Sequence, residues 1–161
     1  MNKFMCRRYL LFCVSLFVNA LGIAFITKAA LGTSPITSVT YVLSMFTPFT
    51  IGQWTILLNL LFVVLELFLM TREDLKSDLR MYLLQIPISF CFGMFIDLCM
   101  HYILFWLNPV EYVYMIVALL VGCVILAVGI ALEVKANAAM MAGEYFVKVI
   151  ARRFRLYKTW I

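Results

Sequence analysis

Four apolar runs, each long enough to cross a lipid bilayer, dominate this chain; they cover about 9–28, 51–70, 82–106 and 112–134. A helix needs about 20 apolar residues to span the hydrocarbon core. Hydrophobic residues make up 66% of the 161 residues and charged residues 13%, against roughly 45–50% and 25% in soluble domains. The runs therefore predict an all-α, polytopic membrane bundle that forms a single transmembrane domain over 1–161.

A fifth apolar segment, 33–46, is too short to cross the membrane. Its 14 residues would rise only about 21 Å as a helix, whereas the hydrocarbon core is about 30 Å thick. Ser34 suits the N-cap of this helix, and Pro35 suits its first position, where no N–H is needed. The pair Thr47-Pro48 should end it. The segment is also rich in hydroxyl groups, and we predict a re-entrant half-helix.

The distribution of Lys and Arg orients the bundle. Three lie before the first span, three in the charged segment 71–80, which we interpret as a loop, and five in the tail 143–161. These groups share one side only if 33–46 does not cross, so the positive-inside rule predicts four spans with both termini cytoplasmic. If 33–46 did cross, the loop and the tail would lie opposite the N-terminus. The tail itself predicts an amphipathic helix in the interface.

A short phrase occurs twice: Gly-Ile-Ala-x-x-x-Lys-Ala stands at 22–29 and again at 129–136, an offset of 107 residues. Two complete spans and part of a third lie between the copies, so the copies run in opposite directions. The repetition predicts an inverted duplication, with repeat one at about 9–106 and a partial repeat two at about 112–161. Such duplications are typical of secondary transporters.

The offset also bears on the end of the chain. It equates residue 161 with residue 54, where the second span opens. We therefore expect a fragment, or a shortened copy, of a six-span protein. A second chain could instead complete the bundle, which makes a homodimer plausible.

Several of these motifs resemble those of a known family. The chain reads ALGTSP at 30–35, GMFID at 93–97 and GIAL at 129–132. It resembles the YczE/YyaS/YitT group of bacterial integral membrane proteins, whose members share ALG-x-x-P, G-x-x-I-D and G-I-A-L. The resemblance implies a multi-spanning inner-membrane protein with a transport or export role and no established substrate. In the group the second break also carries Gly and Pro; here 137–144 has no proline, which weakens the case for a second half-helix.

Asp97 and His101 are the first candidates for a substrate or ion site. A carboxylate inside a span is costly, so Asp97 should face the bundle interior or water. His101 lies four residues on and shares its helix face, so the two could relay protons or hold a cation. The alternative is that both only make hydrogen bonds between helices.

The break after the first span supplies further candidates, Thr33, Ser34 and Lys28. Free N–H groups at the start of a half-helix favour anions, and Lys28 could add charge. Alternatively, the hydroxyl groups only satisfy the backbone of a buried irregular segment. The second copy of the phrase offers Lys135, Asn137 and Glu144 with Glu133 beside them, although these side chains could equally anchor the helix at the interface by snorkelling.

The sequence contains no enzyme signature and implies no cofactor. His101 is the only histidine, so one chain cannot build a multi-histidine metal site. The basic residues flank apolar runs, which argues against nucleic acid and for the bilayer as partner. Two functions stay open: a small-molecule or ion transporter with its site at the broken helix near Asp97, or a docking or regulatory protein that acts through its basic tail.

Overall fold

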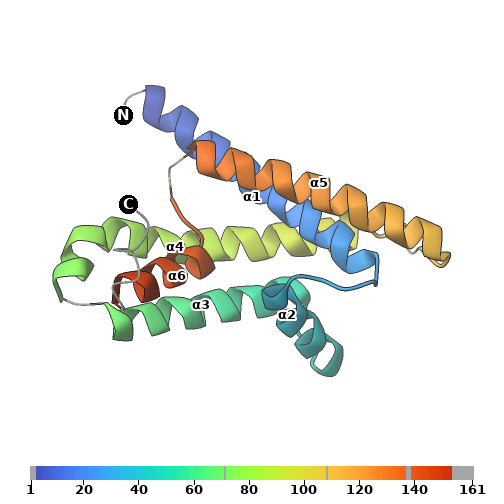
Figure 1. Cartoon of the computed structure of the whole chain (residues 1–161), viewed down its shortest axis with the longest axis horizontal. Coiled ribbons are helices and arrows are strands. Elements are labelled where there is room, and N and C mark those ends of the chain that lie inside the picture. The colour runs from blue at the N-terminus through green and yellow to red at the C-terminus, as the bar shows by residue number, and fades with distance from the viewer. Residues whose placement is uncertain (1–2, 71, 108, 137–138, 154–161) are drawn as a thin grey trace.

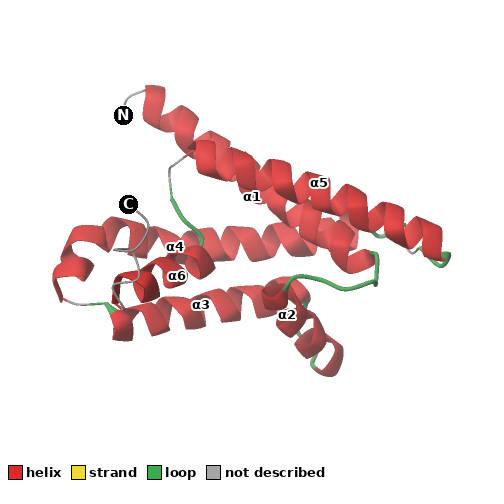
Figure 2. Cartoon of the chain, viewed as in Figure 1, coloured by secondary structure: helices red, strands yellow, loops and turns green. Residues whose placement is uncertain are grey.

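The computed structural model describes residues 3–70, 72–107, 109–136 and 139–153 (Figure 1). Every regular element in these ranges is a helix (Figure 2). In chain order they are α1 (Lys3–Lys28), α2 (Pro35–Phe46), α3 (Ile51–Leu69), α4 (Arg72–Leu98), its π-helical continuation (Cys99–Ile103), α5 (Tyr112–Ala136) and α6 (Ala142–Arg153). Four of them contain apolar stretches long enough to cross a membrane. The all-α, four-span prediction is confirmed, and the chain is an integral membrane protein.

The predicted starts of α2 and α3 are also confirmed. The Ser34 hydroxyl accepts a hydrogen bond from the backbone N–H of Thr37 at 3.3 Å, and Pro35 opens α2. At α3 the Thr50 hydroxyl accepts from the N–H of Gln53 at 3.1 Å, while the Gln53 side chain accepts from the N–H of Thr50 at 3.0 Å. These reciprocal bonds form a capping box. With 12 residues, α2 is too short to span the bilayer.

The prediction of a loop over 71–80 is wrong, because α4 begins at Arg72. The apolar part of this helix starts at Tyr82, so the charged residues form the first turns of a helix that continues into the span. Leu, Lys, Arg and Glu are strong helix formers, which explains why the charged segment does not interrupt the helix. Pro87 lies inside α4, and the helix continues past it.

The tail helix does not present its apolar face to lipid headgroups as predicted. In the structure α6 packs against α3, with Tyr145 and Val149 buried. The Phe146 ring stacks on Phe62 of α3 with centroids 5.2 Å apart. The apolar face of α6 is therefore covered by protein. The rest of the predicted tail helix, 154–161, lies outside the described residues.

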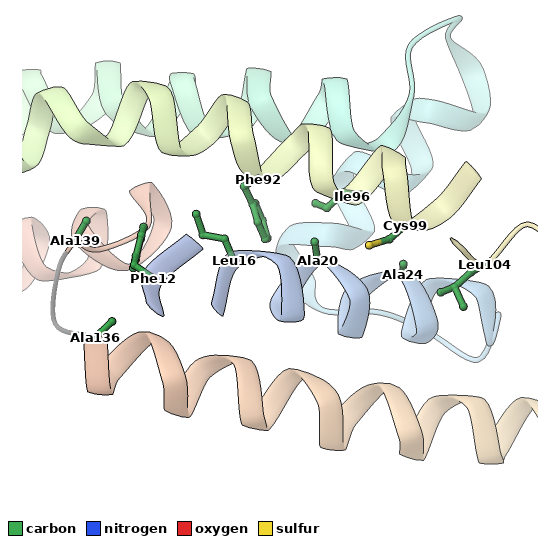
Figure 3. Packing of buried hydrophobic residues seen from close by; sticks show 10 residues of the cluster. All are labelled: Phe12, Leu16, Ala20, Ala24, Phe92, Ile96, Cys99, Leu104, Ala136 and Ala139. Atoms are coloured by element: carbon green, nitrogen blue, oxygen red, sulfur yellow. The ribbon is translucent and has the colours of Figure 1, made fainter. Parts of the chain in front are cut away.

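Helices α1 and α5 lie side by side and antiparallel (Figure 1). Their backbones approach closely at glycines: a Cβ added to Gly22 would stand 2.8 Å from the backbone N of Leu126, and one added to Gly129 would stand 2.9 Å from the backbone N of Asn19. Small residues permit this spacing between membrane helices. On its other side α1 packs against α4 through the main apolar core (Figure 3), where Phe12, Leu16, Ala20 and Ala24 meet residues such as Phe92 and Ile96.

The offset of 107 residues reappears in the positions of the helices. Added to Pro35, the first residue of α2, it gives Ala142, the first residue of α6. A second short helix thus begins at the equivalent position although it has no proline there. The close contacts follow the same offset: Gly22 is equivalent to Gly129, and their partners Leu126 and Asn19 are equivalent to each other.

Candidate functional site

A cavity of about 390 Å³ lies between the helices, and residues from all six α-helices line it. Its walls are mostly apolar. Asn19 of α1 and Phe92 of α4 lie near the middle of their spans, Arg7–Lys28 and Tyr82–Ile103. The cavity is therefore at membrane depth, where the binding sites of many transporters are found.

The cavity is lined by a buried polar pair that joins α1 to α5. The Asn19 amide donates a hydrogen bond to Oε2 of Glu133 at 2.8 Å. Both side chains are almost fully buried, with 3% and 4% of their surface exposed, and Oε1 of Glu133 has no hydrogen-bond partner. A buried carboxylate with an oxygen left unpaired is costly, so the arrangement is unusual for a purely structural contact.

Two threonine hydroxyls of the lining have already used their hydrogens. Thr40 donates to the carbonyl of Thr37 at 2.9 Å, and Thr55 donates to the carbonyl of Ile51 at 2.8 Å. A hydroxyl has one hydrogen and two lone pairs, so each of these side chains can only accept a further bond. Ser34 and Thr37 share a hydrogen bond of 2.9 Å between their hydroxyl oxygens.

A second carboxylate, Glu144, lines the cavity from the first turn of α6. This position favours a negative charge because the helix dipole is positive there. Nearby protein atoms partly desolvate the carboxyl group and raise the pKa of Glu144 above its usual value. No Lys, Arg or His lines the cavity in the part of the chain that the structure describes, so the ionisable side chains of its lining, Glu133 and Glu144, are both acidic.

Most of the lining follows the repeat. Under the offset of 107, twelve of the lining residues form equivalent pairs: Asn19 with Leu126, Ile23 with Ile130, Ser34 with Met141, Ile36 with Gly143, Thr37 with Glu144, and Thr40 with Val147. The remaining lining residues are Thr55, Asn59, Phe92, Ile96 and Glu133. The cavity thus lies where the segments 19–40 and 126–147, whose positions differ by this offset, come together.

Asp97 lies outside this lining, and its carboxylate accepts hydrogen bonds at the start of α3. Its Oδ2 accepts a hydrogen bond from the Thr50 hydroxyl at 2.6 Å, and its Oδ1 accepts from the backbone N–H of Gly52 at 3.0 Å. Gly52 and Gly93 lie face to face here, so that a Cβ on either would collide with the other's carbonyl oxygen. The carboxylate therefore caps α3 across the α3–α4 contact.

His101 does not contact the Asp97 carboxylate. Its Nδ1 lies 3.1 Å from the carbonyl oxygen of Asp97, on the π-helical turn that follows α4. Together with Lys28, His101 lines a separate cavity of about 340 Å³ near the start of α3. The two residues predicted to work as a relay are thus neighbours whose side chains face different partners.

The other predicted residues are dispersed. Ser34 and Glu144 line the central cavity, and Thr33 does not. Lys135 is exposed on α5, and Asn137 lies outside the described residues. The sequence drew attention to Glu133 only as a neighbour of the second-copy candidates, with anchoring at the interface as the alternative. The repeat offered a better signal, because an antiparallel contact of the two copies brings the polar residues of α1 and α5 together.

Replacing Asp97 by alanine should destabilise the protein by about 3 kcal/mol, because two donors lose a charged acceptor. Asp97→Asn should lower the stability by less, since the carbonyl oxygen of the asparagine can still accept one hydrogen bond. Thermal unfolding of the purified protein in detergent measures both. Glu111→Ala removes an exposed carboxylate and serves as the control. An Asp97→Ala protein as stable as this control would contradict the capping role.

Comparison with known proteins places the chain in one family. A model of a family of unknown function, DUF6198, matches residues 6–161. The chain belongs to the DUF6198 family. No curated protein and no solved structure matches it. Membership of DUF6198 assigns no activity, so a function for this protein has to be argued from the cavity and its residues.

Proposed function

We propose that this DUF6198 protein is a small-molecule or ion transporter whose substrate binds in the central cavity. The observation that carries the proposal is the place of the cavity: two equivalent short helices, α2 and α6, begin beside it, and a buried carboxylate lines it. Secondary transporters commonly bind substrate at the interface of inverted repeats, beside broken helices.

The polar lining supports a binding role over a purely structural one. Ionisable side chains at membrane depth are expensive, and they usually mark substrate or ion pathways. Glu133 is such a residue, and it leaves one oxygen unpaired. The proposed site is therefore centred on Glu133 and moves away from Asp97, which is occupied by its contacts with α3.

The orientation of the helices in the membrane is part of the same proposal. With α2 too short to cross, the basic residues before the first span and those at the start of α4 fall on one side, which we assign to the cytoplasm. We also propose that the protein resides in a bacterial inner membrane, that it is related to the YczE/YyaS/YitT group, and that it is not an enzyme. A homodimer remains an expectation.

The docking alternative has less support. Two of the five basic residues of the tail, Arg155 and Lys158, lie in 154–161, outside the described residues. The apolar face of α6 is already covered by α3, so it is not available for a partner. Lys148 extends over the Tyr145 ring, 5.6 Å from its centroid.

A flux measurement tests the transport proposal. Purified protein is reconstituted into liposomes loaded with a mixture of small amines, acids and sugars, and mass spectrometry follows the release of each. We expect at least one solute to leave faster than from protein-free liposomes. Asn59→Trp should abolish this flux because the indole fills the cavity that Asn59 lines. Val124→Trp, which places the same side chain on an exposed face of α5, should retain it. Equal release with all three proteins would contradict the proposal.

A further inference from the structure

We propose that the central cavity selects an organic cation, a protonated amine or guanidinium with an apolar body, and holds its N–H groups at Glu133. This inference rests on the proposed transport function and adds the chemical class of the substrate. It follows from three properties of the cavity: its charge, the direction of its hydrogen bonds and the character of its walls.

The ionisable groups of the cavity are both acidic. Glu133 from α5 and Glu144 from α6 line it, and no described Lys, Arg or His does. The two arginines of α1 that lie towards this end, Arg7 and Arg8, do not line the cavity. The Nε of Arg8 donates to the carbonyl of Ala136 at 3.0 Å. A cation would offset both carboxylates, whereas an anion would add to their repulsion.

Three side chains of the lining offer acceptors to a ligand. Oε1 of Glu133 is buried and unpaired. The hydroxyls of Thr40 and Thr55 donate to backbone carbonyls and keep only lone pairs for a ligand. These acceptors match a ligand that carries several N–H donors. The Asn59 amide, which also lines the cavity, can accept as well as donate. A hydrogen bond from a cationic N–H to a carboxylate is also among the strongest in proteins.

The walls suit an apolar body. Ile23, Ile36, Phe92 and Ile96 line the cavity beside the polar groups. Its volume of about 390 Å³ is in the range of pockets that bind small organic ligands. A bare metal ion or a proton would leave this apolar space unfilled, which favours an organic cation.

The test uses two thiol reagents of similar size and opposite charge. A cysteine replaces Thr40, which lines the cavity, in a protein whose five native cysteines are exchanged for serine or alanine. The rates of modification by 2-aminoethyl and 2-sulfonatoethyl methanethiosulfonate are then measured in detergent. Their ratio, divided by that for free cysteine, should exceed about tenfold, because a negative cavity concentrates cations.

The ratio should collapse towards that of free cysteine in the Glu133→Gln protein and persist in Glu133→Asp. If Glu133→Gln does not purify as a single species, Glu144→Gln should still lower the ratio. Reaction of both reagents without charge preference would overturn the cation inference and leave the transport proposal standing. If neither reagent reacts, the cavity is closed to water and both proposals fall.

Discussion

Replacing Gly22 by alanine is expected to break the packing of α1 on α5 and to remove most of the folded protein. The new Cβ would lie 2.8 Å from the backbone N and 2.9 Å from the Cα of Leu126. Backbone atoms cannot rotate away as a side chain can, so the two helices must separate. Overpacking of this kind costs about 1–3 kcal/mol or more. The yield of monodisperse protein and its thermal midpoint measure the loss.

Gly143→Ala is the matched control for this prediction. A Cβ at Gly143 would meet only the ends of two side chains, Cδ1 of Ile36 at 3.6 Å and Cε2 of Phe62 at 4.0 Å, which are ordinary contacts. Both substitutions improve helix propensity by about 1 kcal/mol, so the comparison isolates the backbone contact. A Gly22→Ala protein as stable as Gly143→Ala would show that α1 and α5 do not pack as closely as described.

Replacing Glu66 and Gln85 together by leucine should stabilise the protein by about 1–4 kcal/mol, the gain seen when buried polar groups are exchanged for packed apolar ones. Glu66 on α3 is 0% exposed and Gln85 on α4 is 1% exposed. The two side chains are close enough to interact. However, no hydrogen bond of good geometry satisfies either carboxylate oxygen of Glu66 or either polar atom of the Gln85 amide. Four desolvated polar atoms therefore oppose folding.

Thermal unfolding in detergent measures this gain, and Glu111→Leu is the control, since it makes the same exchange at an exposed turn. Glu66 and Gln85 do not line the central cavity, so the doubly substituted protein should retain its flux. A double substitution that lowers the thermal midpoint would contradict the account, because it would mean that this pair stabilises the α3–α4 contact.

The sequence predicted the helices because their signals are local. Apolar length marks the spans, Ser34 and Pro35 mark α2, and Thr50 with Gln53 marks α3. Each signal depends on residues within one or two turns. The charged segment 71–80 was misjudged because polarity alone does not distinguish a loop from a helix that projects beyond the membrane.

The site was harder to predict because it depends on contacts between distant residues. Asn19 and Glu133 are 114 positions apart, and nothing near either residue reveals the other. Asp97 attracted attention because an ionisable residue in a span is conspicuous, yet a neighbouring helix start satisfies its carboxylate. The repeat carried part of the information, since its offset pairs twelve of the residues that line the cavity, although Glu133 is not among them.

Two-sided accessibility of the cavity tests the central claim most directly. The Thr40→Cys protein, without its native cysteines, is exposed in right-side-out and in inside-out vesicles to a membrane-impermeant reagent, 2-(trimethylammonium)ethyl methanethiosulfonate. A transport path through the cavity predicts modification of Cys from both sides, because the site must open to each in turn. Modification from one side only, or from neither, would contradict that path.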